Sequence, residues 1–205
     1  MIVPYYSQFE TPEIVVDFLR DGSEAALPRD PLWAQSGAEE LSEYVRWAGN
    51  VCGMACLKMI LAARIGQVHP TLTLARECTS YGGYIVQPDG SIKGLIYAPF
   101  VQYVKMRFDI EAEVVTGVSA IDLGDIMENN AFFLASVHPS IRWPDREPPS
   151  KGGHLVLMTA ASDSTISFHN PSGHTLQTQK HVTLSCNDFG RFFAGRGVAI
   201  RKRFG

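Results

Sequence analysis

The side chain best placed for nucleophilic chemistry is the thiol of Cys52. It follows a turn-like Ala-Gly-Asn stretch and opens the run CGMACLKMILAARIG, whose apolar residues repeat at helical spacing. A thiol at a helix N-terminus lies in the positive end of the helix dipole, so we expect a lowered pKa for Cys52. Gly53 would let a substrate backbone approach closely. Free cysteines are nevertheless among the most buried residues of protein cores, so Cys52 alone does not establish a nucleophile.

Three polar residues elsewhere in the chain could complete such a site. His154 stands at the mouth of the apolar run HLVLMTAA, where it could act as a general base or simply cap a strand end. Asn170 could orient the imidazole, although Asn-Pro is also a common turn starter. Gln8 could donate its amide to an oxyanion beside the backbone N–H of Cys52, with Asn50 as the alternative donor.

Other histidines and cysteines have simpler explanations. Cys56 lies one helical turn after the candidate nucleophile, where it could be a resolving thiol or a small buried residue. His138 ends an apolar run and could line a cleft near His154. His169 alternates with Asn170 along the chain, so only one of the two can face His154, and we expect it to be Asn170.

The loop before His154 carries Asp145, Arg146 and Glu147, which could contact a substrate or form a solvated loop tip. Metal chemistry has little support in the pattern. The chain has four cysteines, with no CxxC pair, and its histidines form no HxH or HxxxH motif. We therefore expect no metal ion and no cofactor.

Taken together, these motifs resemble those of a known enzyme family. Their order is VPYYSQ, then a Cys-Gly that opens a helix rich in Ala, Leu and Met, then a Gly-His followed by apolar residues, then a polar residue before a proline. This order is similar to that of the papain-like cysteine peptidases of the bacteriocin-processing (double-glycine leader peptidase) type and their stand-alone relatives. The resemblance extends from Val3 to about Phe193.

The resemblance implies a role for each matching residue. Cys52 matches the nucleophile, His154 the general base, Asn170 the orienting residue and Gln8 the oxyanion-hole amide. Two departures stand out. The family usually has Asp before the proline, and Asn170 would stabilise an imidazolium less than a carboxylate does. Gln8 is also unusually far from Cys52, so residues 9–46 are predicted to be an insertion.

The apolar pattern changes near the middle of the chain. Helices are predicted over 37–47, from Cys52 to about Gly66, over 71–79 and over 94–107, the last kinked or delayed by Pro99. Before and between them we expect a short strand over 2–6, an irregular stretch with one helical turn over 9–35 and a loop over 80–93. Strands are predicted over 111–116, 131–138, 154–161, 164–169 and 197–202, with short helices over 119–129 and 187–193. The expected fold is therefore α+β and papain-like: a helical N-terminal half, with the nucleophile at a helix N-terminus, and an antiparallel sheet in the C-terminal half.

Composition sets broader limits. The chain has 205 residues, of which 45% are hydrophobic and 19% charged, as is ordinary for one globular domain spanning residues 1–205. A formal charge of −3 provides no basic field for nucleic acid or an anionic membrane. No apolar run approaches the ~18 residues of a membrane span, and the first residues lack a signal-peptide pattern. We expect a cytoplasmic protein without nucleic-acid or membrane partners, while nothing in the sequence indicates an oligomeric state.

The function predicted from these residues is that of a papain-like thiol hydrolase. It would cleave a peptide or amide bond through a Cys-His-Asn triad and a thioester intermediate. The same residues with water excluded would make an acyl- or amidotransferase in a peptide or natural-product pathway. A third possibility is a non-catalytic peptide-binding module. The expected partner is a peptide, amide or acyl substrate, such as a leader peptide or a carrier-bound intermediate.

Overall fold

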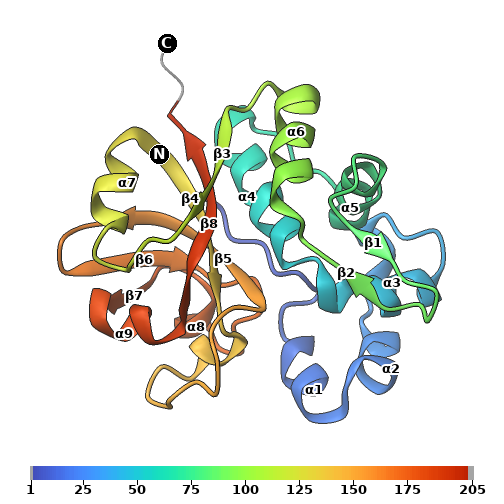
Figure 1. Cartoon of the computed structure of the whole chain (residues 1–205). Helices are drawn as coiled ribbons and strands as arrows, with labels where there is room; N and C mark the ends of the chain where they lie inside the picture. The colour runs from blue at the N-terminus through green and yellow to red at the C-terminus, as the bar shows by residue number, and fades with distance from the viewer. Residues whose placement is uncertain (1, 203–205) are drawn as a thin grey trace.

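The computed structural model describes residues 2–202 and divides them into a helical part followed by a sheet. In Figure 1 the sheet lies on the left and helices α1–α6 lie on the right. The helices of the first part are α1 (Ile14–Asp21), α2 (Ser23–Ala26), α3 (Leu41–Trp47), α4 (Cys52–Ile65), α5 (Thr71–Ser80) and α6 (Tyr97–Phe108). Its 3-10 turns are η1 (Leu27–Arg29), η2 (Trp33–Ser36) and η3 (Ala48–Asn50), and its short antiparallel hairpin pairs β1 (Ile85–Val86) with β2 (Ile92–Lys93).

Helix α4 is the central element of the helical part. Its residues from Gly53 to Leu61 are all buried, so the helix is enclosed around its whole circumference rather than along one stripe. The one charged residue among them, Lys58, pairs with Glu10 at 3.5 Å. It ends where predicted, at Gly66, which adopts the left-handed conformation (φ 68°) that closes many helices. Within residues 2–202 no single helix is long and apolar enough to cross a membrane. Taken together, the stretches Leu41–Asn50 and Cys52–Ile65 have the length and composition of a membrane span, but they form a pair bent by 87°.

The second part is a six-stranded sheet in which every neighbouring pair is antiparallel. The strands, in spatial order, are β3 (Ala112–Thr116), β8 (Phe193–Arg201), β4 (Asn130–Val137), β5 (His154–Ala161), β6 (Thr165–His169) and β7 (Val182–Ser185). The connections contain α7 (Leu123–Asn129), η4 (Pro139–Arg142), α8 (Leu176–Gln179) and α9 (Cys186–Phe192).

Side-chain alternation along the central strands builds a core on each face of the sheet. One face contributes Phe132, Leu134, Leu155, Leu157, Val198 and Ile200 to a cluster with the helical part. The other face contributes Phe133, Ala135, Val137, Val156, Met158 and Ala199 to a cluster with α7 and α9. Strands β4, β5 and β8 are therefore buried on both faces. On the face that packs against the helical part, β5 contacts α4.

The expected strand over residues 2–6 is wrong. This stretch is extended but pairs with no strand among the described residues. It is held instead by single hydrogen bonds to the end of β6: His169 Nε2 lies 3.2 Å from the Val3 carbonyl oxygen, and the Tyr5 hydroxyl donates to the Asn170 carbonyl oxygen at 3.1 Å. Apolar residues predict an extended chain here, but ladder pairing also needs a free strand edge.

Residues 9–35 are more ordered than the irregular stretch with one helical turn expected from their sequence, since they contain α1, α2 and η1 and most of η2. A buried carboxylate organises the wider segment 9–46. Asp30, 1% exposed, accepts hydrogen bonds from the Thr11 N–H (3.1 Å) and hydroxyl (2.6 Å), from the Leu32 N–H (3.0 Å) and from the Tyr44 hydroxyl. Apolar residues of the same segment join the core cluster around α4: Phe9, Ile14, Val15, Leu27, Tyr44 and Val45. The segment is thus part of the core, while its description as an insertion stays a prediction.

Asp30→Ala should destabilise the protein by about 2–4 kcal/mol, since it leaves several buried donors without an acceptor. Urea denaturation followed by circular dichroism measures the change. Asp17→Ala is the matched control, because Asp17 pairs with Arg20 at the surface (2.6 Å) and its loss should cost less than about 1 kcal/mol. Equal effects of the two substitutions would contradict the anchoring role of Asp30.

Candidate active site

Cys52 occupies the first position of α4, as expected, and this helix end lies against the start of β5. The thiol is hydrogen-bonded to the backbone of Leu155, the residue after His154. The space above Gly53 is filled rather than open: a Cβ there would lie 2.8 Å from Leu95 Cδ2 and 3.1 Å from Leu155 Cδ1. Gly53 is therefore needed for close packing of α4, Leu95 and Leu155, and the expectation of free room for a substrate backbone is wrong.

His154 is the first residue of β5 and only 6% exposed. It pairs in register with Val137 at the end of β4. On the other side of β5, the antiparallel neighbour β6 ends at His169, so the next residue, Asn170, emerges beside the start of β5. The result is a hydrogen bond between His154 Nε2 and Asn170 Oδ1 of 2.8 Å. Register in the sheet thus brings together two residues that are far apart in the chain.

The orientation of the Asn170 amide follows from its second contact. Its Oδ1 also accepts the backbone N–H of Ser172 at 3.1 Å, whereas its Nδ2 has no partner. Reversing the amide would direct an NH₂ group at that N–H, so Oδ1 must face both donors. The imidazole of His154 then carries its proton on Nε2, which leaves the Nδ1 lone pair as its basic atom.

His169 points away from this site, as expected from the alternation of side chains. Its ring lies 4.7 Å from the ring of His181, centroid to centroid, and its Nδ1 accepts the backbone N–H of His181 at 3.0 Å. Together with the bond to the Val3 carbonyl, these contacts give His169 a structural role in holding the N-terminal stretch against β6.

Gln8 is brought against the turn that precedes Cys52 despite the long separation in sequence. It is buried, and its Nε2 donates to the carbonyl oxygen of Ala48 at 2.9 Å, in the 3-10 turn that leads into Cys52. One amide hydrogen is used in this bond and the second is left. The alternative donor, Asn50, is exposed and donates to the Arg46 carbonyl oxygen at 3.1 Å. The structure therefore places Gln8 deep against the turn before Cys52 and leaves Asn50 at the surface.

Burial controls the protonation of the candidate nucleophile and base. It raises the pKa of Cys52 and outweighs the backbone hydrogen bonds at the helix start, so the lowered pKa expected from the helix dipole is wrong. Burial, with the nearby charge of Arg142, also lowers the pKa of His154 to about 3, although the bond to Asn170 acts in the opposite direction. Both shifts favour the neutral forms, the thiol and the neutral imidazole.

Two residues beside His154 carry no recognisable signal in the sequence. Arg142, at the end of η4, donates from Nη2 to the Ser172 hydroxyl at 2.7 Å. That hydroxyl lies 3.2 Å from His154 Nε2 and 3.5 Å from Asn170 Oδ1. Arg142 falls in a proline-rich stretch predicted to be a loop, and a serine directly after Asn-Pro is an ordinary turn residue. Neither could be assigned before the register of β4, β5 and β6 was known.

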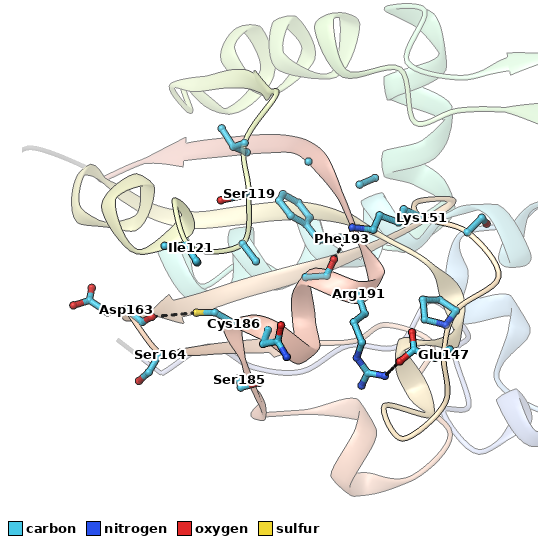
Figure 2. Close-up of a pocket in the computed structure, with 18 residues that line it drawn as sticks. Ser119, Ile121, Glu147, Lys151, Asp163, Ser164, Ser185, Cys186, Arg191 and Phe193 are labelled. Carbon is cyan, nitrogen blue, oxygen red and sulfur yellow. Dashed lines mark hydrogen bonds and ion pairs between the residues drawn. The ribbon is translucent and has the colours of Figure 1, made fainter.

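A separate pocket of about 1190 Å³ lies by the start of β8 and the start of α9. Figure 2 shows the bonds that already engage the side chains of Arg191, Lys151 and Cys186. Arg191 binds Glu147 at 2.8 Å, Lys151 donates to the Gly190 carbonyl oxygen at 2.8 Å, and the Cys186 thiol donates to the Ser162 and Asp163 carbonyl oxygens. Burial raises the pKa of Cys186. The chemistry of the protein is therefore better sought at Cys52. Within residues 2–202, no three His, Cys, Asp or Glu side chains are grouped so as to hold a metal ion.

No protein-family model matches this chain, and no curated protein matches it in sequence. Solved structures match it in fold. The peptidase domain of Streptococcus ComA, a bifunctional ABC transporter of a quorum-sensing pathway, aligns at 14% identity with a TM-score of 0.51, over 76% of this chain and 93% of that domain. A putative C39-like peptidase from Bacillus anthracis aligns at 15% identity with a TM-score of 0.51, over 75% of this chain and 89% of that one. At such identities a likeness establishes the fold alone: the predicted α+β, papain-like architecture is confirmed, and it is similar to that of C39 peptidase domains.

Proposed function

We propose that this protein is a cysteine peptidase that uses Cys52 as nucleophile and His154 as general base. One observation carries the proposal: the Cys52 thiol is hydrogen-bonded to the backbone of Leu155, directly after His154, and Nε2 of His154 lies 2.8 Å from Asn170 Oδ1. Nucleophile, base and orienting group are the three parts of a thiol-acylation site. The similarity of the fold to C39 peptidase domains supports a peptide as the substrate.

The reaction begins from a neutral pair. Nδ1 of His154 takes the thiol proton as Sγ attacks the scissile carbonyl carbon, which becomes tetrahedral. The backbone N–H of Cys52 and the remaining amide hydrogen of Gln8 stabilise the oxyanion. The imidazolium then protonates the leaving amine, the C–N bond breaks, and the acyl group stays on Cys52 as a thioester. Water, activated by the same Nδ1, hydrolyses the thioester and regenerates the thiol.

Asn170 holds the imidazole without adding a negative charge. A carboxylate at this position would stabilise the imidazolium of an ion pair, whereas the amide mainly fixes the tautomer and the ring orientation. This arrangement fits general-base catalysis by a neutral imidazole. Transfer of the acyl group to an amine in place of water would use the same steps up to the thioester, but no observation favours an acceptor other than water.

The first prediction concerns alkylation of Cys52. In native protein treated with iodoacetamide from about pH 5 to about pH 9, the rate at Cys52 should rise with pH without a plateau at low pH, since the thiol is neutral. His154→Ala should lower this rate by about tenfold or more at neutral pH, because the general base is lost. Mass spectrometry follows each thiol separately, with Cys78 and Cys186 as internal controls. If Cys52 reacts no faster than these two, the protein is better regarded as a non-catalytic binding module.

The second prediction concerns the reaction itself. A mixture of synthetic peptides incubated with the protein should yield hydrolysed products that are absent with Cys52→Ala and reduced by about 10²–10⁴-fold with His154→Ala. His69→Gln is a suitable control, because His69 lies between α4 and α5 against the ring of Phe108, and it should retain most of the activity. Cleavage that survives in Cys52→Ala would overturn the assignment of the nucleophile.

The third prediction tests the role of the amide. Asn170→Asp introduces a carboxylate against Nε2 and should raise the pKa of His154, because an opposite charge favours the imidazolium. More of the thiolate–imidazolium pair then exists in mild acid, and the rate of Cys52 alkylation at about pH 5 should increase roughly tenfold. Asn187→Asp, on the distant pocket, should leave that rate unchanged. An unchanged rate in Asn170→Asp would mean that Asn170 does not act on the imidazole.

A further inference from the structure

An arginine is buried beside the catalytic imidazole without a carboxylate partner. Arg142 is 5% exposed, and apart from its bond to Ser172 it contacts the ring of Trp143, with Cζ 5.5 Å from the ring centroid. Its buried Nε has no hydrogen-bond partner. No Asp or Glu among the described residues lies within ion-pair distance of it. A buried charge with no opposite charge is costly, so a compensating anion is the simplest reason to keep it.

A second guanidinium shares the same indole. Arg146 is exposed and its Cζ also lies 5.5 Å from the centroid of the Trp143 ring. Arg146 forms no ion pair with a described acidic residue, although Asp145 and Glu147 flank it in sequence, and Glu147 pairs with Arg191 instead. The ring of His174 lies 5.4 Å from that of Trp143. We call Arg142, Trp143, Arg146 and His174 the Trp143 cluster. It has a cationic character and contains no acidic side chain.

The cluster lies next to the reacting groups. Ser172 Oγ connects the two, because it accepts from Arg142 and lies 3.2 Å from Nε2 of His154. The loop that carries Arg142 and Arg146 leaves β4 just after Val137, which pairs with His154. The oxyanion donors belong to the opposite side of the site, on α4 and Gln8. The imidazole protonates the leaving amine from Nδ1, while the Trp143 cluster approaches its other nitrogen, Nε2, through Ser172. Because base and cluster both belong to the sheet side, we infer that the leaving part of a substrate lies on that side.

We propose that the Trp143 cluster binds a carboxylate on the leaving part of the peptide, either an acidic side chain or the free C-terminus. The inference rests on the proposed peptidase function and adds a substrate class to it. Guanidinium groups bind carboxylates through paired hydrogen bonds, and an indole holds them in a fixed plane. Arg146 is the exposed group that the carboxylate contacts first. Arg142 is the buried group whose charge the bound carboxylate neutralises.

Binding of the carboxylate would also act on the base. The charge of Arg142 contributes to the low pKa of His154 and to the lowered pKa of both His138 and His174. A carboxylate on Arg142 would offset that charge and raise the pKa of His154 in the complex. A substrate with the right charge would therefore make the imidazole a stronger base than it is in the free protein.

The first test uses a small anionic probe and needs no peptide. Iodoacetate and iodoacetamide alkylate the same thiol but differ in charge, so the ratio of their rates at Cys52 reports a nearby cation. Arg146→Gln should lower this ratio by about threefold or more. Arg142→Gln should lower it as well while keeping a hydrogen-bond donor toward Ser172. Arg107→Gln is the matched control, since Arg107 also stacks on an aromatic ring (5.2 Å from the Phe108 centroid), but on α6.

The second test uses pairs of peptides that differ only in charge after the cleaved bond. If a side chain is bound, peptides with Asp or Glu in that part should be cleaved at least about fivefold faster than those with Asn or Gln. If the terminus is bound, peptides with a free C-terminus should be cleaved faster than those with a C-terminal amide. In either case Arg146→Gln should remove the preference, whereas Arg107→Gln should not.

The two levels of the proposal fail in different ways. If Cys52 alkylation depends on His154 but neither the probe ratio nor the peptide preference responds to Arg146→Gln, the carboxylate site is overturned and the peptidase stands. Arg146 is exposed, so its substitution leaves the fold intact even if Arg142→Gln does not. If Cys52 is no more reactive than Cys78, the peptidase proposal and the carboxylate site are both overturned.

Discussion

The hydrogen bond between His154 and Asn170 depends on most of the sheet, and most of the site depends on it. It exists because β5 begins where β6 ends, which antiparallel pairing brings about and which the pairing of Leu157 with His169 fixes in register. A slip of one residue would send Asn170 to the opposite face and bring His169 toward the imidazole. The bond sets the tautomer of His154 and so decides which ring nitrogen can act as a base.

The N-terminal stretch ties this edge of the sheet to the helical part. The Tyr5 hydroxyl and the backbone N–H of Gln8 bind the Asn170 and Pro171 carbonyl oxygens, at 3.1 and 2.9 Å, and the Gln8 side chain binds the Ala48 carbonyl oxygen ahead of α4. One short segment therefore contacts both Asn170 and the turn that leads into Cys52. This explains how Gln8 can lie against the turn before Cys52 although residues 9–46 lie between them in the chain.

Burial has different consequences for polar groups that are fully hydrogen-bonded and for those that are not. Asp30 is fully supplied with donors and organises its segment, whereas Arg142 Nε and Asn170 Nδ2 are buried without hydrogen-bond partners. A fully bonded buried carboxylate serves stability. Incompletely bonded groups beside a nucleophile are more typical of a site that completes its contacts when a ligand arrives.

The sequence by itself determined the residue types, the order of the elements and the helical and strand periods. Helix α4, its end at Gly66, and strands β4, β5 and β6 follow from apolar spacing and turn residues, and the motifs around Cys52 and His154 predicted the papain-like fold. Tertiary structure decided the rest. Whether residues 2–6 found a strand partner, how deeply the thiol was buried, and that Arg142 and Ser172 meet His154 all depend on contacts between distant segments. Such contacts leave no periodic trace in a single sequence. Pairing register and desolvation are set by the packing of distant segments, not by residues that are adjacent in the sequence.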